Sequence, residues 1–261
     1  MRIYIITMDD PIQTRDFIKY IIQNKQNEII GLAQAKGDRM TIGKKRSKVG
    51  YLFSLMLIMG ISNFIKNSSK TLIDKILKKL SKYKLSSNPS IGAYTESLGI
   101  ETTYIKSANN AAFLDRLREL KPDIIINQSQ SIIKKELLDI PTIGVLNRHN
   151  ALLPKNRGRL TPFWVLLKKE EYTGVSIHFV TEGIDAGEIV VQEKYKVEKN
   201  DTFNSIVKKN YQIAPKAMVK AIDLLEKGIN DFLPNNDQEA TYNTVPTLKD
   251  AWNYRKTRIL K

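Results

Sequence analysis

Three side chains in the middle of the sequence have the chemistry that acyl transfer needs. Asn147 and His149 stand two positions apart at the end of an apolar run, and Asp185 lies between two glycines. In an extended strand, side chains two positions apart point to the same side. An amide can donate to a developing oxyanion, an imidazole can move protons near neutral pH, and a carboxylate can orient that imidazole. No protein nucleophile is required if the substrate itself supplies an amine.

Taken alone, these three residues leave two interpretations open. An Asn-x-His pair occurs often by chance, and a histidine that is hydrogen-bonded at a strand end for structural reasons would look the same. His178 lies within a strand pattern, so we expect it to be structural. Asp9 and Asp10 could suggest a metal, but helix capping explains them better, and we expect no metal site.

The surrounding elements alternate as in an α/β protein. Strands are predicted at residues 2–7, 28–33, 101–105, 123–127, 143–147, 175–180 and 188–195. Helices are predicted at residues 12–24, 111–120, 131–138, 162–169 and 202–227. This order predicts a mostly parallel sheet with helices on both faces, in which ligands bind at the carboxyl ends of the strands. No G-x-G-x-x-G motif follows the first strand, so we expect no dinucleotide site there.

A basic segment at residues 44–86 interrupts this pattern. It holds eleven Lys and Arg against one acid, Asp74. Residues 72–80 place apolar side chains at helical spacing, with lysines on the other face, which predicts a basic amphipathic helix. Three interpretations stay open: a helical hairpin packed on the body with a solvated lysine face, a helix on an anionic membrane surface, or an RNA contact. The apolar run at 51–65 is shorter than the roughly 20 residues that span a bilayer.

Composition sets the broad class of protein. The apolar fraction of 42% over 261 residues is sufficient for a substantial core. The formal net charge of +15 predicts attraction to polyanions. Cysteine is absent, which excludes disulfides and thiol chemistry, and the first residues do not read as a signal peptide. We therefore expect a cytoplasmic protein, with a peripheral membrane contact as an open alternative.

Four motifs in order resemble the folate-dependent formyltransferase family. They are residues 147–149, 152–158, 174–178 and 185–189, which read NRH, LLPKNRG, GVSIH and DAGEI. The resemblance is dense from 121 to 200, weaker over 1–40 and absent over 44–90. It implies a Rossmann-like α/β catalytic domain at 1–200 carrying a basic helical insertion at 44–90. Residues 201–261 would form a C-terminal extension, a helix followed by an extended tail.

The resemblance also implies the roles of particular residues. Asn147, His149 and Asp185 match the family's catalytic triad, and the donor would be N10-formyltetrahydrofolate. The family binds the pterin largely through the backbone of two loops. The matching residues here are Gln130, Ser131, Ile132, Ile133, Val180, Thr181, Glu182 and Gly183. The chain departs from the family pattern at Asn150-Ala151, where Pro-Ser is usual, and at Asn156, where Tyr is common.

The acceptor is expected to be a small amine. Barely sixty residues follow residue 200, which is too few for the C-terminal β-barrel that the family's tRNA formyltransferases normally carry. The segment after the first strand is not the Gly-rich phosphate loop of the family's glycinamide ribonucleotide enzymes. The resemblance therefore favours an amino-sugar nucleotide as the acceptor. Arg157 and Lys155 are the candidate substrate contacts, although Arg157 could instead pin its loop. A methionyl-tRNA formyltransferase-like enzyme, hydrolysis of formyl-folate and a non-catalytic binding module are the alternatives. Nucleic acid is not the expected partner, and a homodimer is left open.

Overall fold

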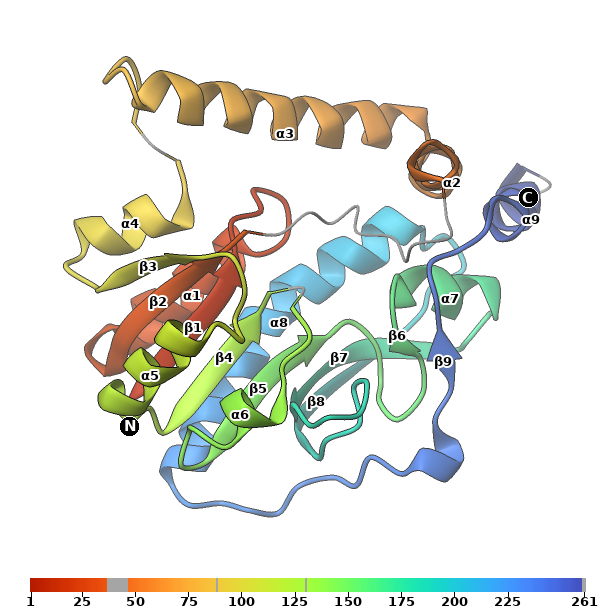
Figure 1. The fold of residues 1–261 in the computed structure, drawn as a ribbon. Helices are drawn as coiled ribbons and strands as arrows, with labels where there is room; N and C mark the ends of the chain where they lie inside the picture. The colour runs from red at the N-terminus through yellow and green to blue at the C-terminus, as the bar shows by residue number, and fades with distance from the viewer. Residues whose placement is uncertain (37–46, 88, 130, 260–261) are drawn as a thin grey trace.

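A seven-stranded, mostly parallel sheet forms the centre of the protein, seen in a computed structural model that describes residues 1–36, 47–87, 89–129 and 131–259 (Figure 1). The strand order is β3-β2-β1-β4-β5-β7-β8. The strands are β1 (Ile3–Met8), β2 (Ile29–Ala35), β3 (Thr102–Ile105), β4 (Ile124–Gln128), β5 (Gly144–His149), β7 (Tyr172–Phe179) and β8 (Ile189–Lys196). The expected α/β class is confirmed.

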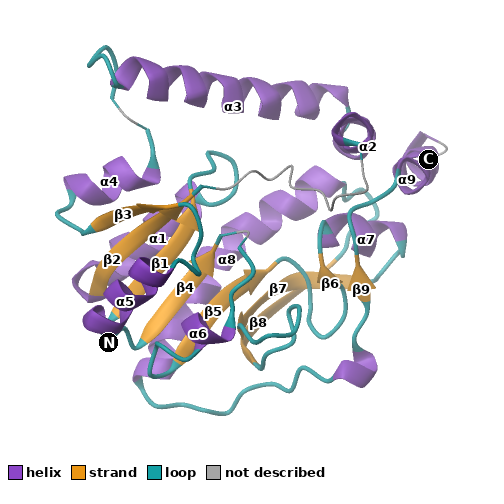
Figure 2. Ribbon diagram, in the orientation of Figure 1, coloured by secondary structure: helices purple, strands orange, loops and turns teal. Residues whose placement is uncertain are grey.

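Helices cover both faces of this sheet (Figure 2). On one face α1 (Arg15–Lys25), α4 (Ile91–Ser97) and α8 (Phe203–Glu226) pack against Ile3, Ile5 and Ile126. On the other face α5 (Ala111–Leu120) and the short α6 (Lys135–Leu138) pack against alternate residues of the same strands. Strands buried on both faces need continuous apolar sequence, and β1 is buried at every position.

The sheet changes direction next to β5. Strands β1 to β5 run parallel, whereas β7 pairs with β5 in the antiparallel sense and β8 pairs with β7 in the same way. The register sets Asn147 opposite His178 and His149 opposite Ser176. The turn between β7 and β8 therefore returns to the end of β5, where it brings Asp185 toward the two residues.

The basic segment forms two helices, α2 (Lys48–Met59) and α3 (Ile61–Ser81), which bend at Gly60. Gly60 has φ +80°, a value that favours glycine. Helix α2 packs on the body through Ile58 in a cluster with Phe163 and Tyr254. Helix α3 lies across the top of the molecule, apart from the sheet, as Figure 1 shows.

The outward side of α3 is apolar. Leu72, Ile73 and Ile76 are 60%, 56% and 49% exposed, whereas Asp74 is buried and Lys78 turns toward the body. The helices do pack on the body and several lysines are exposed, as one interpretation predicts, but buried ion pairs rather than the apolar residues attach α3. No single described helix is long and apolar enough to cross a membrane. Together, α2 and α3 pass that test by length and composition, across a bend of 120°.

The C-terminal segment is more structured than the sequence predicts. The long helix expected at 202–227 is confirmed as α8. After it, η2 (Asp237–Glu239) leads to β9 (Tyr242–Asn243), which pairs with β6 (Arg157–Gly158). The last described element is α9 (Leu248–Ile259), where we had expected only an extended tail. The remaining helix, α7 (Thr161–Leu167), matches the prediction at 162–169.

Candidate active site

The structure brings the three predicted side chains together. Asn147 and His149 stand at the end of β5, and Asp185 follows β7 in a left-handed backbone conformation, with φ +49°. The Asp185 Oδ2 atom lies 3.4 Å from His149 Nδ1, and its Oδ1 atom lies 3.7 Å from His178 Nε2. The amide, imidazole and carboxylate therefore form one cluster at the edge of the sheet.

Both ring nitrogens of His149 face oxygen acceptors. Nε2 lies 2.8 Å from the backbone carbonyl of Asn156, and Nδ1 faces Asp185. A carbonyl and a carboxylate can only accept, so a protonated ring can donate to both at once. Asp185 is fixed in turn, because its Oδ2 atom accepts a 2.8 Å bond from the backbone N–H of Gly158. The carboxylate thus orients the imidazole.

Asn147 is oriented by a neighbour that the sequence analysis did not identify. Its Oδ1 atom accepts a 2.9 Å bond from Nε2 of Gln128, the last residue of β4. This bond commits the amide oxygen and leaves the amide nitrogen as the donor on the other side. That nitrogen lies 3.4 Å from His178 Nε2 and has a second hydrogen for a ligand.

His178 is buried beside these residues, as its strand position predicts. Its Nδ1 atom lies 2.8 Å from the carbonyl of Phe179, which accepts a bond, so Nε2 is left as an acceptor toward Asn147. Burial is the main cause that lowers the pKa of His178 to about 4; the carboxylate of Asp185 opposes this shift, and His149 adds to it. His178 is therefore neutral at physiological pH and helps to position Asn147.

The loop before β6 ties the site to the C-terminal segment. The Asn156 amide nitrogen donates to both carboxylate oxygens of Glu170 at 2.9 Å, and its backbone N–H donates to Thr241. This residue replaces the tyrosine expected from the family pattern, and its carbonyl is the partner of His149. A non-local contact of this kind leaves no pattern in the local sequence.

Arg157 does not contact a substrate in this arrangement. It is fully buried, and its guanidinium donates to Asp237, Tyr242 and Asn235 at 2.6 to 2.9 Å. The expectation that Arg157 binds the substrate is therefore corrected: the side chain pins the C-terminal segment. Lys155 is exposed, and its role as a substrate contact stays a prediction.

A cleft of about 920 Å³ opens beside the three residues. Its walls are the end of β5, the turn after β1, the first turns of α8 and the polar side of α3. Its positively charged lining residues are Lys75, Lys78, Arg148 and Arg159. Its aromatic lining residues are Tyr51, Phe64, Phe203 and Tyr211. The basic segment thus forms one wall of the cleft, which could receive a ligand that carries both a ring system and negative charge.

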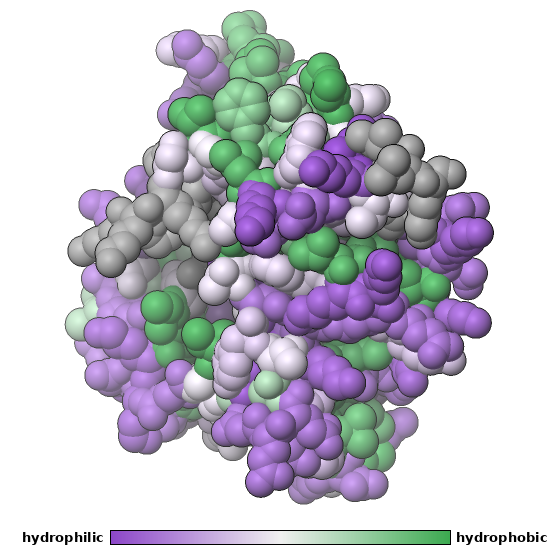
Figure 3. Space-filling view, turned by 90° about the vertical axis from the view of Figure 1, so that its right-hand side faces the viewer, coloured by the Kyte–Doolittle hydropathy of each residue, from purple (hydrophilic) through white to green (hydrophobic). Residues whose placement is uncertain are grey.

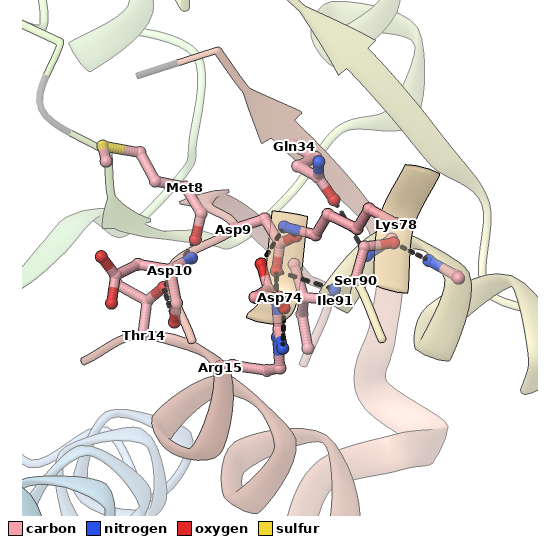
Figure 4. A network of polar contacts seen from close by, with 12 residues as sticks. Met8, Asp9, Asp10, Thr14, Arg15, Gln34, Asp74, Lys78, Ser90 and Ile91 are labelled. Carbon is pink, nitrogen blue, oxygen red and sulfur yellow. Dashed lines mark hydrogen bonds and ion pairs between the residues drawn. The ribbon is translucent and has the colours of Figure 1, made fainter. Parts of the chain in front are cut away.

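A buried ion cluster holds α3 over this cleft (Figure 4). Asp74 lies 2.8 Å from Arg15 and 2.7 Å from Lys78, while Asp9 pairs with the same two cations. Burial would raise the pKa of Asp74, but its bonds to Arg15 and Lys78 lower it on balance. Asp9 also accepts a 3.0 Å bond from the backbone N–H of Ile91, so the cluster connects α3 with β1, α1 and α4.

The two aspartates after β1 have structural partners. The Oδ1 atom of Asp10 accepts bonds of 2.7 and 2.8 Å from the backbone N–H groups of Ile12 and Gln13, in the turn before α1, whereas the N-cap residue of α1 is Thr14, so the expected helix cap is corrected to a turn. Among residues 1–36, 47–87, 89–129 and 131–259, no group of three or more His, Asp and Glu side chains is arranged to hold a metal ion.

The predicted pterin loops follow β4 and β7, on either side of β5 in the sheet. Ile133 is buried on the α5 and α6 face, and Val180 packs against the same cluster. The predicted residues that are more open to solvent are Ser131, Ile132, Thr181, Glu182 and Gly183. Gln130 lies outside the described residues. None of the described loop residues lines the large cleft, which opens toward α1, α3 and α8.

Known formyltransferases are similar to this chain in sequence. The model of the "Formyl transferase" family matches residues 71–222, a match that begins inside α3. The methionyl-tRNA formyltransferase of Prochlorococcus marinus (strain MIT 9215) is 39% identical over 126 residues, covering 48% of this chain and 38% of the relative. The bifunctional polymyxin resistance protein ArnA of Wigglesworthia glossinidia brevipalpis is 34% identical over 164 residues, 61% of this chain and 25% of that protein.

A solved structure has the same fold at low sequence identity. It is the N-formyltransferase from Helicobacter canadensis, in complex with folinic acid and dTDP-3-aminofucose. The TM-score is 0.58 at 19% identity, over 94% of this chain and 71% of the other. The chain spans 38% and 54% of two methionyl-tRNA formyltransferases of Prochlorococcus marinus, from strains MIT 9215 and MIT 9312. Because the family model covers more than half of the 261 residues, the chain belongs to the formyl transferase family.

Proposed function

We propose that this chain transfers a formyl group from N10-formyltetrahydrofolate to the amine of an amino-sugar nucleotide. The observation that carries the proposal is the convergence of Asn147, His149 and Asp185 on the wall of the 920 Å³ cleft. This arrangement presents an amide donor beside an imidazole and no protein nucleophile, which suits direct attack by a substrate amine. Membership of the formyl transferase family supports the donor and the reaction class.

The donor site would lie on the α5 and α6 side of β5, between residues 131–133 and 180–183. The Helicobacter enzyme with the same fold was solved with folinic acid, a formyl-folate. Ile132 and Ile184 are 85% and 65% exposed in these two loops, and they offer apolar surface to a flat pterin ring. The acceptor would enter from the opposite side, through the cleft under α3.

The lining of the cleft supports a nucleotide-linked acceptor. Arg148 lies between the rings of Phe17 and Tyr211, 4.6 and 5.4 Å from their centroids, and this positions its charge at the cleft wall. Cationic side chains bind diphosphates, and aromatic side chains stack on bases. The Helicobacter enzyme was solved with an amino-sugar nucleotide, dTDP-3-aminofucose, which fits this combination.

The reaction follows from the positions of the donors. The neutral acceptor amine attacks the formyl carbon, and a tetrahedral oxyanion forms. Asn147 Nδ2–H donates to this oxyanion and contributes roughly 2–4 kcal/mol, and His149, whose ring N–H groups face Asn156 and Asp185, would stabilise it through the positive charge of the ring. The bond between the formyl carbon and N10 then breaks, N10 takes a proton, and the amine nitrogen loses one. Asp185 keeps His149 oriented, accepts the amine proton directly or through water, and passes a proton on to N10, so the carboxylate is restored.

A tRNA acceptor is the second candidate. The curated relatives that the chain matches include methionyl-tRNA formyltransferases, and the net charge of +15 suits a polyanion. The Lys and Arg side chains in the cleft would then contact the end of the tRNA. A non-catalytic binding role is less compatible with a complete triad beside a large cleft, whereas hydrolysis of formyl-folate is distinguished by its independence of an acceptor. We expect the reaction to take place in the cytoplasm, in keeping with the absence of cysteine.

The test is an acceptor panel read by mass spectrometry. The purified chain is mixed with N10-formyltetrahydrofolate and, separately, with amino-sugar nucleotides and with methionyl-tRNA. We expect a mass increase of one formyl group on an amino-sugar nucleotide, and none with His149→Ala. Formylation of methionyl-tRNA alone would replace the proposed acceptor with the second candidate. Release of free formate at the native rate without any acceptor would indicate a hydrolase.

A further inference from the structure

The outer face of α3 and the adjoining part of α2 form an exposed apolar stripe. At 3.6 residues per turn, five residues of α3 fall on one side of the helix, opposite the side that faces the cleft. They are 49% to 63% exposed: Ile61, Ile65, Leu72, Ile73 and Ile76. Helix α2 adds two more exposed apolar residues, Val49 at 61% and Phe53 at 53%. Single exposed apolar residues are ordinary, but a row of this length marks a contact surface.

Figure 3 shows where this surface lies. Hydrophobic side chains gather at the upper end of the molecule, which is the level of α2 and α3 in Figure 1, while the lower part is largely hydrophilic. On the face that Figure 3 shows, the main group of exposed hydrophobic side chains lies at this end of the protein.

Lysines border the stripe on both sides. Lys79 lies along one edge of α3, next to Lys75 of the cleft wall, Lys66 and Lys70 lie along the other, and all four are exposed. Within the part of the chain that the structure describes, no acidic group lies within ion-pairing distance of any of these four lysines. An apolar stripe flanked by unneutralised lysines is the pattern of a helix that lies in the plane of a membrane surface.

We propose that α2 and α3 dock on an anionic lipid bilayer through this stripe. The apolar side chains would enter the boundary between headgroups and acyl chains, and the flanking lysines would contact acidic headgroups. A second copy of the chain fits less well, because a symmetric contact would bring like-charged lysines together. RNA phosphates would bind the lysines and leave the apolar row in water.

The anchoring of the helices favours lying on the membrane over crossing it. The inner side of α2 is buried against α7 and α9 through Ile58, so only one side of this helix is available to lipid. Asp74 and Lys78 hold the inner side of α3 to the body in the buried ion cluster. Docking through the outer side leaves these contacts intact, so α3 can bind the membrane and still form a wall of the cleft. The inference does not depend on the proposed reaction.

Vesicle flotation tests this surface with the full chain. Vesicles of equal parts phosphatidylglycerol and phosphatidylcholine are compared with pure phosphatidylcholine at about 0.1 M salt, where charges still interact over roughly 10 Å. We expect the native chain to float with the anionic vesicles only. The apolar variant carries three serine substitutions on α3, at Leu72, Ile73 and Ile76. We expect it to bind these vesicles more than tenfold more weakly.

Matched variants distinguish binding through this surface from non-specific binding to lipid. The apolar control carries serine at three exposed positions on other faces: Ile143, Ile229 and Leu233. It should float like the native chain. The charge variant Lys70→Gln/Lys79→Gln should lose about 25-fold, since each lysine near an anionic surface contributes about fivefold. The exposed pair Lys106→Gln/Lys227→Gln, distant in sequence from α3, should lose much less.

Circular dichroism and the melting temperature of each variant confirm that it is folded. The proposal is overturned if the native chain does not float with anionic vesicles, or if the apolar variant floats as well as the native chain. It is also overturned if the native chain does not bind vesicles but forms a dimer or an RNA complex that the apolar variant does not form. Because the readout is lipid binding, a failure here leaves formyl transfer untested and unaffected.

Discussion

Replacing Asp185 with asparagine removes the negative charge of the carboxylate and keeps the size and shape of the side chain. The asparagine side chain keeps an oxygen that can accept the bond from Gly158, so the loop should hold its conformation. Asp185 lies 3.4 Å from His149 Nδ1, and both side chains are largely buried. At an effective dielectric constant of about 20, a charge pair at that distance interacts by about 5 kcal/mol. Part of this interaction is already present before the reaction begins.

We therefore expect Asp185→Asn to lose about 3 to 4 kcal/mol of transition-state stabilisation, which lowers kcat roughly 10²- to 10³-fold. KM for the acceptor should change by much less, because Asp185 acts through His149. The assay is the initial rate of acceptor-dependent tetrahydrofolate release, with the melting temperature as the folding control. Glu188→Gln, an exposed carboxylate three residues further along, is the matched control and should keep the native rate. A folded Asp185→Asn protein with kcat within threefold of native would refute the role we assign to this carboxylate.

Three further predictions concern the groups around the site. Gln128→Ala frees the Asn147 amide to rotate, so kcat should fall about tenfold with little change in folding; an unchanged kcat would show that Gln128 does not orient the amide. His178→Gln should make the stability of the fold less sensitive to acid. The pKa of His178 in the folded protein is about 4, below the ordinary 6.5, so the unfolded chain binds the proton first as pH falls. The native protein therefore loses about 3 kcal/mol of unfolding free energy between pH 6.5 and pH 4. Urea titrations at both pH values should show a smaller loss in the variant than in the native chain, and equal losses would contradict the prediction. Asp74→Ala should lower the free energy of unfolding by about 2 kcal/mol, since a second carboxylate remains in the cluster, whereas the exposed Asp115→Ala should stay within about 0.5 kcal/mol; equal melting temperatures would contradict this.

The sheet and its helices were predictable because their signals are local. Strands β1 and β4 are rich in isoleucine and are buried on both faces. Short apolar segments of this kind are typical of the central strands of a parallel sheet. The position of Asn147 and His149 at a strand end followed from the same pattern. Their approach to Asp185 depends on the antiparallel turn after β7, and the family resemblance supplied that link.

The orientation of α3 could not be predicted from its pattern. Periodicity shows that a helix has two different faces, but it does not show which of them meets the body. Here the buried ion pairs of Asp74 with Arg15 and Lys78 decide the orientation, and they join parts of the chain that are far apart in sequence. The apolar face, which usually points inward, therefore faces outward.

The role of the C-terminal segment was missed for a similar reason. Arg157 binds Asp237 and Asn235, about eighty residues away, and nothing in the local sequence indicates this pairing. Helix α9 is mostly polar, and it is held mainly by Ala251 and Tyr254 against α2 and α7. A helix with so few apolar contacts has little amphipathic pattern to detect.

The most direct measurement follows the formyl group itself. N10-formyltetrahydrofolate with a ¹³C-labelled formyl carbon is mixed with excess enzyme and an amino-sugar nucleotide for a single turnover, and the label is located by NMR. We expect the label to appear as a formamide on the acceptor, at a rate that falls at least 100-fold with His149→Ala or Asn147→Ala. Label that stays on the folate, emerges as free formate, or reaches the acceptor at an undiminished rate in either variant would contradict a reaction carried by these side chains.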